Sequence, residues 1–426
     1  MLYSKEIMDK QGFSSNKLAD ARFLQANKID ELLTKGVEKI YPSKEALEKI
    51  LRQGKKLRLY QGFDPSMSNL HLGNFVGLVK LRQFQDLGYE VIFLVGDFTG
   101  MIGDPTDKSS TRRRLSRSQV LKNAKNWKKQ AGKILNFDGE NPAKIMFNSA
   151  WSDKITFKDL IEITSNFTAQ QLLERDMFQK RIKEGKPIFL HELLYPVAQA
   201  IDCVKMNVDL ELGGSDQMFN MMAGRTLMKV ILGKEKFVMT TKLLVDSTGA
   251  KVGKTAGNAI FLNRKPADIF GAIMSFPDEV ISLGFELLTF RGMEEIKKII
   301  QELSQPKTNP MDLKKELAFE IVKILAGENE AQKAKEEFEL VFQKRALPTE
   351  IGVVNLARGF ISGATVTDVL VESGLASSKS EAKRLITQGG TVVQDKTITN
   401  PNASFPQEDE VTIQVGKRRF IKIKTS

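Results

Sequence analysis

Three residues between positions 60 and 75 have the types and spacing that suit phosphate binding. Gly62 and Gly73 carry no side chain, so a nucleotide can approach the backbone closely, and His71 supplies an imidazole donor. From Leu72 onward the apolar residues recur with helical spacing, which predicts a helix that begins directly after His71. The free N–H groups and positive dipole end of such a helix favour phosphate. We predict a nucleotide site here; the alternative is an ordinary strand-to-helix turn.

A second group of chemically capable residues forms a polar stripe in LHELLYPVAQAIDCVKM, residues 190–206. Tyr195, Gln199 and Asp202 are spaced i, i+4 and i+7, so all three project from one face of a helix. A solvent-facing stripe would be the simplest explanation, but none of these three residues is a Lys or a Glu. A phenol, an amide and a carboxylate framed by apolar residues instead favour a binding stripe.

Two loops rich in glycine and polar residues add further candidates. In GDFTGMIGDPTDKSSTRRR, residues 96–114, Asp104 is the acidic candidate, although an Asp-Pro pair after glycines is commonly a turn. In VDSTGAKVGKTAGN, residues 245–258, Lys251, Lys254 and Thr255 could close over a triphosphate. Taken alone, this second loop would be interpreted as a solvated lysine loop.

Two of these segments resemble the signatures of class I aminoacyl-tRNA synthetases. YQGFDPSMSNLHLGN, residues 60–74, resembles the first signature, His-Ile-Gly-His, in the longer context seen in tyrosyl-tRNA synthetases. KVGKT, residues 251–255, resembles the second, Lys-Met-Ser-Lys-Ser. Either match alone is weak, whereas both in this order are specific. Asn74 stands where the first signature has its second His; an amide still donates a hydrogen bond, so we expect a modest change rather than loss of function.

The resemblance implies a binding site for tyrosine. In that family the residues matching Tyr195 and Gln199 contact the amino group of the substrate, and the residue matching Asp202 accepts from its phenolic hydroxyl. Tyr60 resembles the second hydroxyl partner. Phenylalanine would leave these buried groups without the hydrogen bonds for which they gave up water, which favours tyrosine. The tyrosine-binding residues that the resemblance implies are Tyr60, Asp104, Tyr195, Gln199, Asp202 and Gln217.

The implied reaction is two-step aminoacylation. The carboxylate of L-tyrosine attacks the α-phosphorus of ATP, and the tyrosyl group then passes to the 3′ end of tRNA(Tyr). A carboxylate is ionised at neutral pH, so the first step needs alignment and charge stabilisation rather than a base. We expect Mg²⁺ to arrive with ATP, and no metal held by the protein. The candidate catalytic residues are Ser66, His71, Asn74, Lys251, Lys254 and Thr255. The candidate ATP-binding residues are Gly62, Asp64, His71, Gly73, Asn74, Gly214, Asp216 and Lys254.

The composition suits a polyanionic partner. The 426 residues carry a formal net charge of +12, and residues 108–133 contain ten Lys or Arg and no Asp or Glu. No apolar run approaches the length of a membrane span and residues 1–17 lack a signal-peptide core, so we expect a cytoplasmic protein with no membrane partner. Cys203 is the lone cysteine, which excludes an intramolecular disulfide and a cysteine-rich metal cluster.

The predicted order of strands and helices around these residues indicates an α/β fold. Strand, helix and strand within residues 57–95 make a right-handed βαβ unit. Further along we predict one basic helix over residues 115–135 and a strand over 208–212. The three predicted domains are a Rossmann-like parallel-sheet catalytic domain over residues 1–262 that includes the KVGKT loop, an α-helical domain on the anticodon-stem side over 263–345, and a linker with a small α+β RNA-binding domain like that of a ribosomal protein over 346–426.

The resemblance also implies partners and leaves alternatives. In the C-terminal module Lys379, Lys383 and Arg384 share one helix face and are the candidate tRNA contacts, and the family implies a homodimer. One alternative is a tryptophanyl-tRNA synthetase, whose first signature often ends in Asn. The other is a catalytically silent RNA-binding protein built on the same scaffold.

Overall fold

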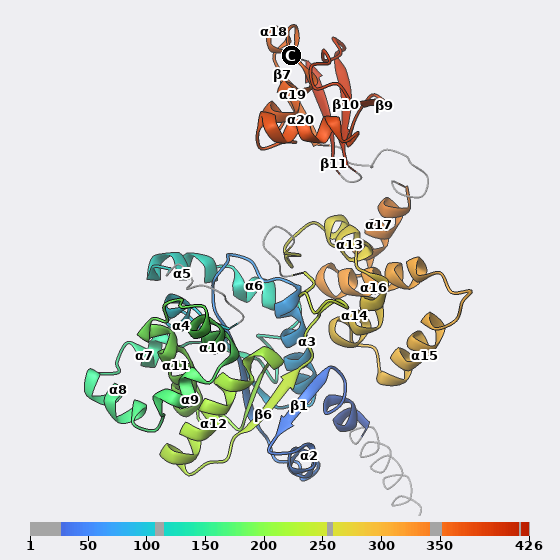
Figure 1. Ribbon diagram of the computed structural model, residues 1–426. Coiled ribbons are helices and arrows are strands. Elements are labelled where there is room, and N and C mark those ends of the chain that lie inside the picture. The colour runs from blue at the N-terminus through green and yellow to red at the C-terminus, as the bar shows by residue number, and fades with distance from the viewer. Residues whose placement is uncertain (1–26, 107–114, 254–258, 341–351, 417–418, 426) are drawn as a thin grey trace, which may run out of the picture. The chain divides into compact units, whose positions relative to one another are not determined.

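The computed structural model describes residues 27–106, 115–253, 259–340, 352–416 and 419–425 (Figure 1). The chain divides into two compact units, Met1–Ala331 and Gln332–Ser426. The predicted domain boundary after residue 262 falls inside the first unit, and the one after residue 345 falls outside the described residues. Both boundaries stay predictions.

A six-stranded sheet forms the centre of the first unit, in the order β1-β6-β5-β2-β3-β4. β1 pairs antiparallel with β6, and the other neighbours are parallel, which confirms the predicted α/β class. The predicted strand EVIFLV is β3, buried along nearly its whole length as a central parallel strand requires. The strands are β1 (Val37–Tyr41), β2 (Arg58–Phe63), β3 (Glu90–Val95), β4 (Lys144–Phe147), β5 (Leu210–Gly214) and β6 (Phe237–Thr241).

Helices connect and cover these strands. The predicted helix after His71 is α3, and α14 of the following helical region packs against it. The helices of the first unit are α2 (Lys44–Arg52), α3 (Leu72–Asp86), α4 (Thr99–Ile102), α5 (Arg117–Ala124), α6 (Trp127–Ala131), α7 (Ser149–Ser152), α8 (Phe157–Thr164), α9 (Ala169–Leu173), α10 (Asp176–Lys183), α11 (Leu190–Met206), α12 (Met218–Leu232), α13 (Pro266–Met274), α14 (Ile281–Leu288), α15 (Met293–Leu303) and α16 (Pro310–Ala326); α17 (Glu328–Phe338) spans the division between the units.

Two predicted elements differ from the structure. The single helix over residues 115–135 is wrong: α5 and α6 are separate, because the chain leaves helical geometry at Asn126, a residue type that competes with helical hydrogen bonding. The strand over residues 208–212 starts later, as β5 at Leu210. Asn207 ends α11 in the left-handed conformation, with φ 48°, and the chain needs two more residues to enter the sheet.

The second unit contains a five-stranded sheet in the order β7-β11-β10-β8-β9. Apolar residues of its helices and strands form one core, including Val366, Ile386 and Ile413. The strands are β7 (Gly352–Leu356), β8 (Thr391–Val393), β9 (Lys396–Ile398), β10 (Glu410–Val415) and β11 (Arg419–Thr425), and the helices are α18 (Arg358–Ile361), α19 (Val366–Glu372) and α20 (Lys379–Thr387). The predicted small α+β module is confirmed, and β7 and β9 are additions to it.

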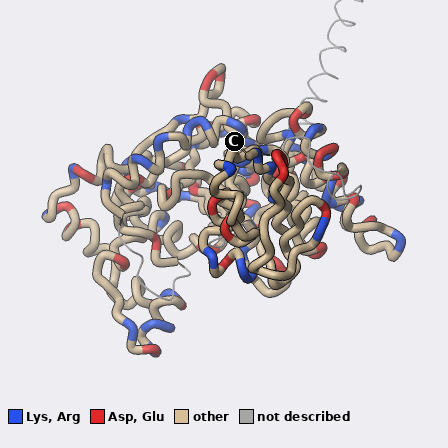
Figure 2. The backbone as a smooth tube through the Cα atoms, turned by 90° about the horizontal axis from the view of Figure 1, so that it is seen from above, with Lys and Arg blue, Asp and Glu red and all other residues tan. Residues whose placement is uncertain are grey.

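Charge is mixed along most of the backbone, where basic and acidic residues follow one another at short intervals (Figure 2). The α5–α6 segment differs because its lysines are exposed without neighbouring acids in sequence. These exposed lysines are Lys122, Lys125, Lys128, Lys129 and Lys133. Among the helices that the structure describes, none has the length and apolar character that crossing a membrane requires.

Candidate active site

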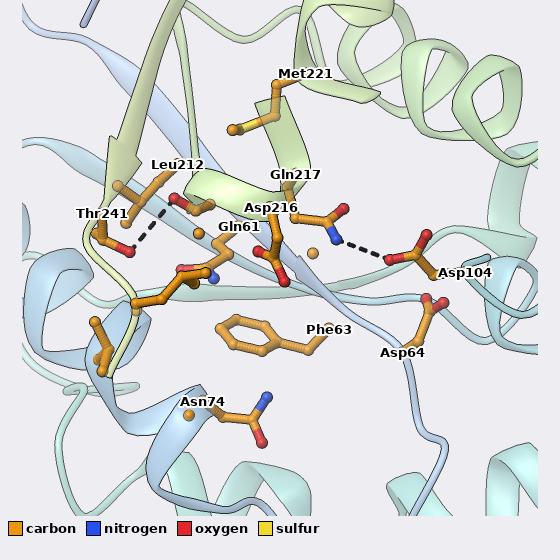
Figure 3. A pocket seen from close by; sticks show the side chains of 18 of the residues that line it. Gln61, Phe63, Asp64, Asn74, Asp104, Leu212, Asp216, Gln217, Met221 and Thr241 are labelled. Carbon is orange, nitrogen blue, oxygen red and sulfur yellow. Dashed lines mark hydrogen bonds between the residues drawn. The ribbon is translucent and has the colours of Figure 1, made fainter. Parts of the chain in front are cut away.

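A cavity of about 220 Å³ lies at the carboxyl ends of β2 and β5. These neighbours lie where the strand order reverses, the position at which open α/β sheets bind ligands. In Figure 3 the ring of Phe63 lies between Asn74 on one side and Asp216 on the other, and Asp64 and Asp104 approach each other at one end. The sheet therefore gathers polar groups from segments far apart in sequence.

The first signature forms the start of α3. The backbone N–H of His71 donates to Oδ1 of Asn74 at 3.0 Å, so the amide oxygen of Asn74 caps the helix. The nitrogen of that amide points toward the cavity (Figure 3). Asn74 thus retains the donor that a phosphate contact requires.

The segment that follows the second signature is hydrogen-bonded to the first. The N–H of Leu72 donates to the carbonyl of Ile260 at 3.0 Å, and the N–H of Leu262 donates to the carbonyl of Leu70 at 2.9 Å. Two segments about 190 residues apart in the sequence are thereby held side by side.

Lys251 opens the second signature inside the cavity. Its ammonium contacts Oδ2 of Asp216 at 2.7 Å, which joins KVGKT to the GGSDQ segment after β5. Lys254 and Thr255 lie outside the described residues, so their positions stay predictions.

One end of the cavity is anionic. Oδ2 of Asp64 accepts from the hydroxyl of Tyr195 at 2.8 Å, and Oδ1 accepts from the hydroxyl of Thr99 at 2.6 Å. Burial, followed by the charge of Asp64, raises the pKa of Tyr195 well above its usual value, so this phenol keeps its proton and donates. The amide of Gln217 donates to Oδ2 of Asp104 at 2.8 Å (Figure 3). Two carboxylates at one end suit a ligand ammonium group.

Asp202 lies at the other end of the polar stripe and is held by two donors. Nε1 of Trp151 donates to its Oδ1 at 2.8 Å, and Nδ2 of Asn148 donates to its Oδ2 at 3.2 Å. Burial raises the pKa of Asp202 well above its usual value, although both hydrogen bonds oppose that shift. Tyr60 is buried at the same cavity, and its hydroxyl donates to Oε1 of Glu211 at 2.5 Å.

Comparison with known proteins identifies the family. The sequence model described as "tRNA synthetases class I (W and Y)" matches residues 52–343, and the "S4 domain" model matches residues 367–411. The tyrosine–tRNA ligase of Thermotoga maritima is 42% identical over 394 residues, which cover 92% of this chain and 96% of the relative. That of Aquifex aeolicus is 42% identical over 395 residues, covering 92% and 97%. This chain belongs to the tyrosine–tRNA ligase family of class I synthetases.

Solved structures of the family share the fold. A C-terminally truncated mitochondrial tyrosyl-tRNA synthetase of Coccidioides posadasii superposes with a TM-score of 0.61 at 20% identity, over 78% of this chain and 100% of that one. The Archaeoglobus fulgidus tyrosyl-tRNA synthetase, solved with L-tyrosine, gives 0.55 at 21% identity, over 72% and 98%. The predicted family, class I fold and tyrosine branch are confirmed, and the tryptophanyl and silent alternatives are not supported.

The structure brings the predicted catalytic, tyrosine-binding and ATP-binding residues of the described chain to this one cavity. The role of each residue stays a prediction. The predicted residues that line the cavity are Tyr60, Gly62, Asp64, Ser66, His71, Gly73, Asn74, Asp104, Tyr195, Gln199, Asp202, Gly214, Asp216, Gln217 and Lys251.

Sequence reasoning missed the residues that support these groups. Thr99, Asn148 and Trp151 hold predicted carboxylates, but nothing in their local sequence marks them. Glu211 did carry a signal, because it is a charged residue between leucines in a buried strand. Arg175 was also missed; it is buried, lies 4.0 Å from Oδ1 of Asp104 and donates to the hydroxyl of Thr106 at 2.6 Å.

The predicted tRNA contacts lie on α20 of the second unit. Lys379, Lys383 and Arg384 are all exposed there. Lys379 also contacts Asp368 at 2.7 Å, so part of its charge is already balanced. Their contact with RNA stays a prediction.

Proposed function

We propose that this chain attaches tyrosine to tRNA(Tyr) at the expense of ATP, through a tyrosyl-adenylate intermediate. The observation that carries the proposal is the meeting of His71, Lys251 and the stripe Tyr195–Gln199–Asp202 at a single cavity. None of these segments alone would support the proposed reaction, because the nucleotide and the amino acid must lie next to each other for the first step.

The amino acid lies along the polar stripe. Its ammonium group lies at the end formed by Tyr195, Gln199 and Asp104, where Gln217 donates to Asp104 and also approaches the ligand carboxylate. Its phenol lies at the end formed by Tyr60 and Asp202, both buried. This orientation directs the carboxylate toward the helix that begins at His71.

ATP lies between the two signatures. Gly62 and Gly73 allow close backbone approach, while His71, the amide of Asn74 and Ser66 face the phosphates. The ribose lies at Gly214 and Asp216, so the Lys251 ammonium that now contacts Asp216 moves to phosphate when ATP binds. Lys254 and Thr255 complete the charge stabilisation during attack on the α-phosphorus.

Mg²⁺ enters as part of the substrate, bound to the phosphates of ATP. In the described part of the chain no group of three or more His, Cys, Asp or Glu side chains is arranged to hold a metal ion. Carboxylates near the cavity are instead engaged by protein donors, as Asp64 and Asp104 show.

The tRNA contacts both units. Lys379, Lys383 and Arg384 supply phosphate contacts from the S4 domain, and the exposed lysines of the α5–α6 segment supply further ones. The reaction takes place in the cytoplasm, where tRNA and ATP are available.

The active form is a homodimer. Support comes from large apolar side chains that are exposed in the segment between β4 and β5: Phe157 on α8 is 78% exposed and Leu190 on α11 is 73% exposed. Light scattering of the purified chain would give a mass of twice 47.8 kDa. A mass of a single chain at micromolar concentration would contradict the homodimer.

Amino-acid-dependent exchange of pyrophosphate into ATP, measured across a panel of amino acids, tests the reaction. Tyrosine should support exchange and tryptophan should not. Exchange with tryptophan would revive the tryptophanyl alternative, and exchange with no amino acid would favour the silent one.

Two substitutions test the assigned roles. Lys254→Ala should slow adenylate formation by about 10²- to 10³-fold while leaving the Kd of tyrosine within about twofold, because its contact forms with charge in the transition state. Asp202→Ala should reduce discrimination against phenylalanine. Equal losses of rate and tyrosine affinity for the first, or unchanged selectivity for the second, would remove the residue from its assigned role.

A further inference from the structure

A buried ion pair that the proposed mechanism does not use lies behind the phenol end of the cavity. Glu211 on β5 contacts Lys236, which directly precedes β6, and their side chains are 2% and 0% exposed. The Lys236 ammonium also donates to Sγ of Cys203 at 3.2 Å and to the carbonyl of Met221 at 3.0 Å. All three of its donors are therefore engaged by Glu211, Cys203 and Met221.

A glycine makes room for this pair. A Cβ on Gly224 of α12 would lie 2.6 Å from both Sγ of Cys203 and Nζ of Lys236, and 3.2 Å from Oε2 of Glu211. The pair is thus enclosed by α11, α12 and two strands. It is built into the fold and is not an incidental contact of mobile side chains.

The other carboxylate oxygen of Glu211 faces the site. Its Oε1 accepts from the hydroxyl of Tyr60 at 2.5 Å and from Nε2 of Gln199 at 2.9 Å. Tyr60 and Gln199 line the cavity, whereas Glu211 does not. Glu211 therefore acts on a ligand through hydrogen bonds to these two side chains and not by direct contact.

Hydrogen-bond direction follows from this arrangement. Glu211 beside the Lys236 ammonium is a carboxylate, which accepts but does not donate. The Tyr60 hydroxyl also lies 3.1 Å from Sγ of Cys203, but its shorter contact is to the carboxylate, so we assign its single proton to Glu211. The Tyr60 oxygen can then only accept from a ligand. A ligand phenol has one proton, and here it goes to Tyr60. Asp202, which the family resemblance makes the acceptor of that proton, must then donate to the ligand oxygen in its protonated form, as its raised pKa allows. An isosteric group without a proton leaves the Tyr60 oxygen without a donor.

We propose that Glu211, paired with Lys236, is a positioning residue that takes the proton of Tyr60 and thereby selects amino acids whose para substituent donates a hydrogen bond. This inference rests on the proposed function, since it concerns how tyrosine is distinguished from analogues of the same size. It predicts that the site selects a para substituent because it donates a hydrogen bond and not merely because it is polar.

Two size-matched analogues test the criterion. 4-Aminophenylalanine carries N–H donors at the para position, and 4-fluorophenylalanine carries none. In pyrophosphate exchange the unmodified chain should use the amino compound with a kcat/KM at least about tenfold higher than that of the fluoro compound, because an unsatisfied buried acceptor is costly. A ratio near one would overturn the proposal.

A pair of double variants isolates Glu211. Glu211→Leu with Lys236→Met removes both charges and the carboxylate acceptor. Sulfur is a weak acceptor, so the Cys203 thiol does not hold the Tyr60 proton as a carboxylate does, Tyr60 can donate to a ligand, and the ratio should fall to within about threefold. Glu211→Gln with Lys236→Met removes the charges but keeps one acceptor oxygen, so the ratio should persist. An unchanged ratio in the Leu–Met variant would overturn the proposal, since a purely structural role would lower kcat for both analogues alike.

A single variant covers the case in which the Leu–Met protein fails to fold. Tyr60→Phe removes the accepting oxygen itself and should lower the ratio in the same way, while a ratio that survives would overturn the proposal. The unmodified chain with tyrosine separates the two levels of inference. No exchange there refutes the proposed function, whereas exchange with tyrosine and a flat analogue ratio refutes only the role of Glu211.

Discussion

Two ion pairs of this molecule are buried to nearly the same degree but have different surroundings. Arg181 and Glu192 are 1% and 3% exposed, and Lys236 and Glu211 are 0% and 2% exposed. The first pair joins α10 to the first turn of α11, and the second lies between β5, β6 and the cavity. Burial alone would assign them the same importance.

The first pair fixes the path of the chain into α11. Nη1 and Nη2 of Arg181 donate to the two oxygens of Glu192 at 2.7 and 3.0 Å, and Nη2 also donates to the carbonyl of Pro187. Glu192 in turn accepts from the N–H of Phe189 at 2.9 Å. These contacts hold the loop before the helix that carries the polar stripe, at a distance from the ligand.

The second pair contacts side chains that line the cavity. Its partners include the hydroxyl of Tyr60 and the amide of Gln199. The function of a buried charge is therefore decided by what its remaining lone pairs and protons contact. We therefore expect both pairs to affect stability and only the second to affect ligand selection.

The largest effects on stability should come from substituting the cation of each pair. Arg181→Met and Lys236→Met each leave a buried carboxylate without its cation, so each should lower the free energy of unfolding of the first unit by about 3–5 kcal/mol. Urea unfolding followed by circular dichroism measures this. A loss below about 1 kcal/mol in either variant would mean that water or another group satisfies the abandoned carboxylate.

Removing both partners of each pair should show which pair affects the KM of tyrosine. Arg181→Met with Glu192→Leu should recover most of the lost stability and keep the KM of tyrosine within about twofold, because apolar replacement of a buried pair is often neutral. Glu211→Leu with Lys236→Met should recover stability equally well, but raise the KM of tyrosine about tenfold, equivalent to about 1.4 kcal/mol. Equal KM values in the two double variants would remove the distinction between them.

Much of the fold could be predicted because its signals are local. The βαβ unit, the stripe on α11 and the small C-terminal module follow from periodicity, glycines and apolar runs. The break between α5 and α6 could not be predicted from periodicity, since apolar residues continue in helical register past Asn126. The break follows from Asn126, whose side chain competes with helical hydrogen bonding, and the spacing of apolar residues does not reveal that competition.

The candidate site, like the fold, could be predicted only in part. Residues within the two signatures and the stripe were predictable from type, spacing and resemblance, and they line one cavity. The residues behind them were not. Trp151 and Asn148 approach Asp202 from more than 50 residues away, and the Lys236 that neutralises Glu211 lies 25 residues along the chain. Such pairings depend on strand order, which local patterns do not specify.

A smaller effect should follow from crowding the second pair without changing its charges. Gly224→Ala would place a methyl group 2.6 Å from Nζ of Lys236, so we expect a loss of about 1–3 kcal/mol in unfolding free energy. Gly359→Ala is the matched control, because Gly359 is also helical and nothing lies within 4 Å of its added Cβ. The control should gain up to about 1 kcal/mol from helix propensity. A gain in unfolding free energy in both variants would show that the side chains around Lys236 move aside for the added methyl group at little cost.

The smallest effect concerns a third buried charge, which contacts carbonyl oxygens in place of a carboxylate. Nζ of Lys80 donates to the carbonyls of Leu32 and Lys35 at 3.0 and 2.6 Å, and burial, followed by the charge of Lys35, lowers the pKa of Lys80 from 10.5 to about 7. Lys236 shows the opposite direction: burial opposes its charge, but Cys203 and Glu211 raise its pKa. A buried lysine therefore keeps its proton across neutral pH beside a carboxylate and loses it beside carbonyls.

This difference should appear in the pH dependence of stability. Between pH 7 and 10 the unfolded chain holds the Lys80 proton more tightly than the folded chain does, so this residue makes stability rise with pH, by at most about 1.4 kcal/mol per unit. Lys80→Met should reduce the measured slope and leave the part due to Lys35, whose pKa burial lowers to about 8. Lys236→Met should leave the slope unchanged, because Lys236 stays protonated in both states. Urea unfolding at pH 7, 8 and 9 measures the slopes. Parallel slopes in the unmodified chain and Lys80→Met would mean that carbonyl oxygens alone keep a buried ammonium charged, and that a carboxylate partner is not what distinguishes Lys236.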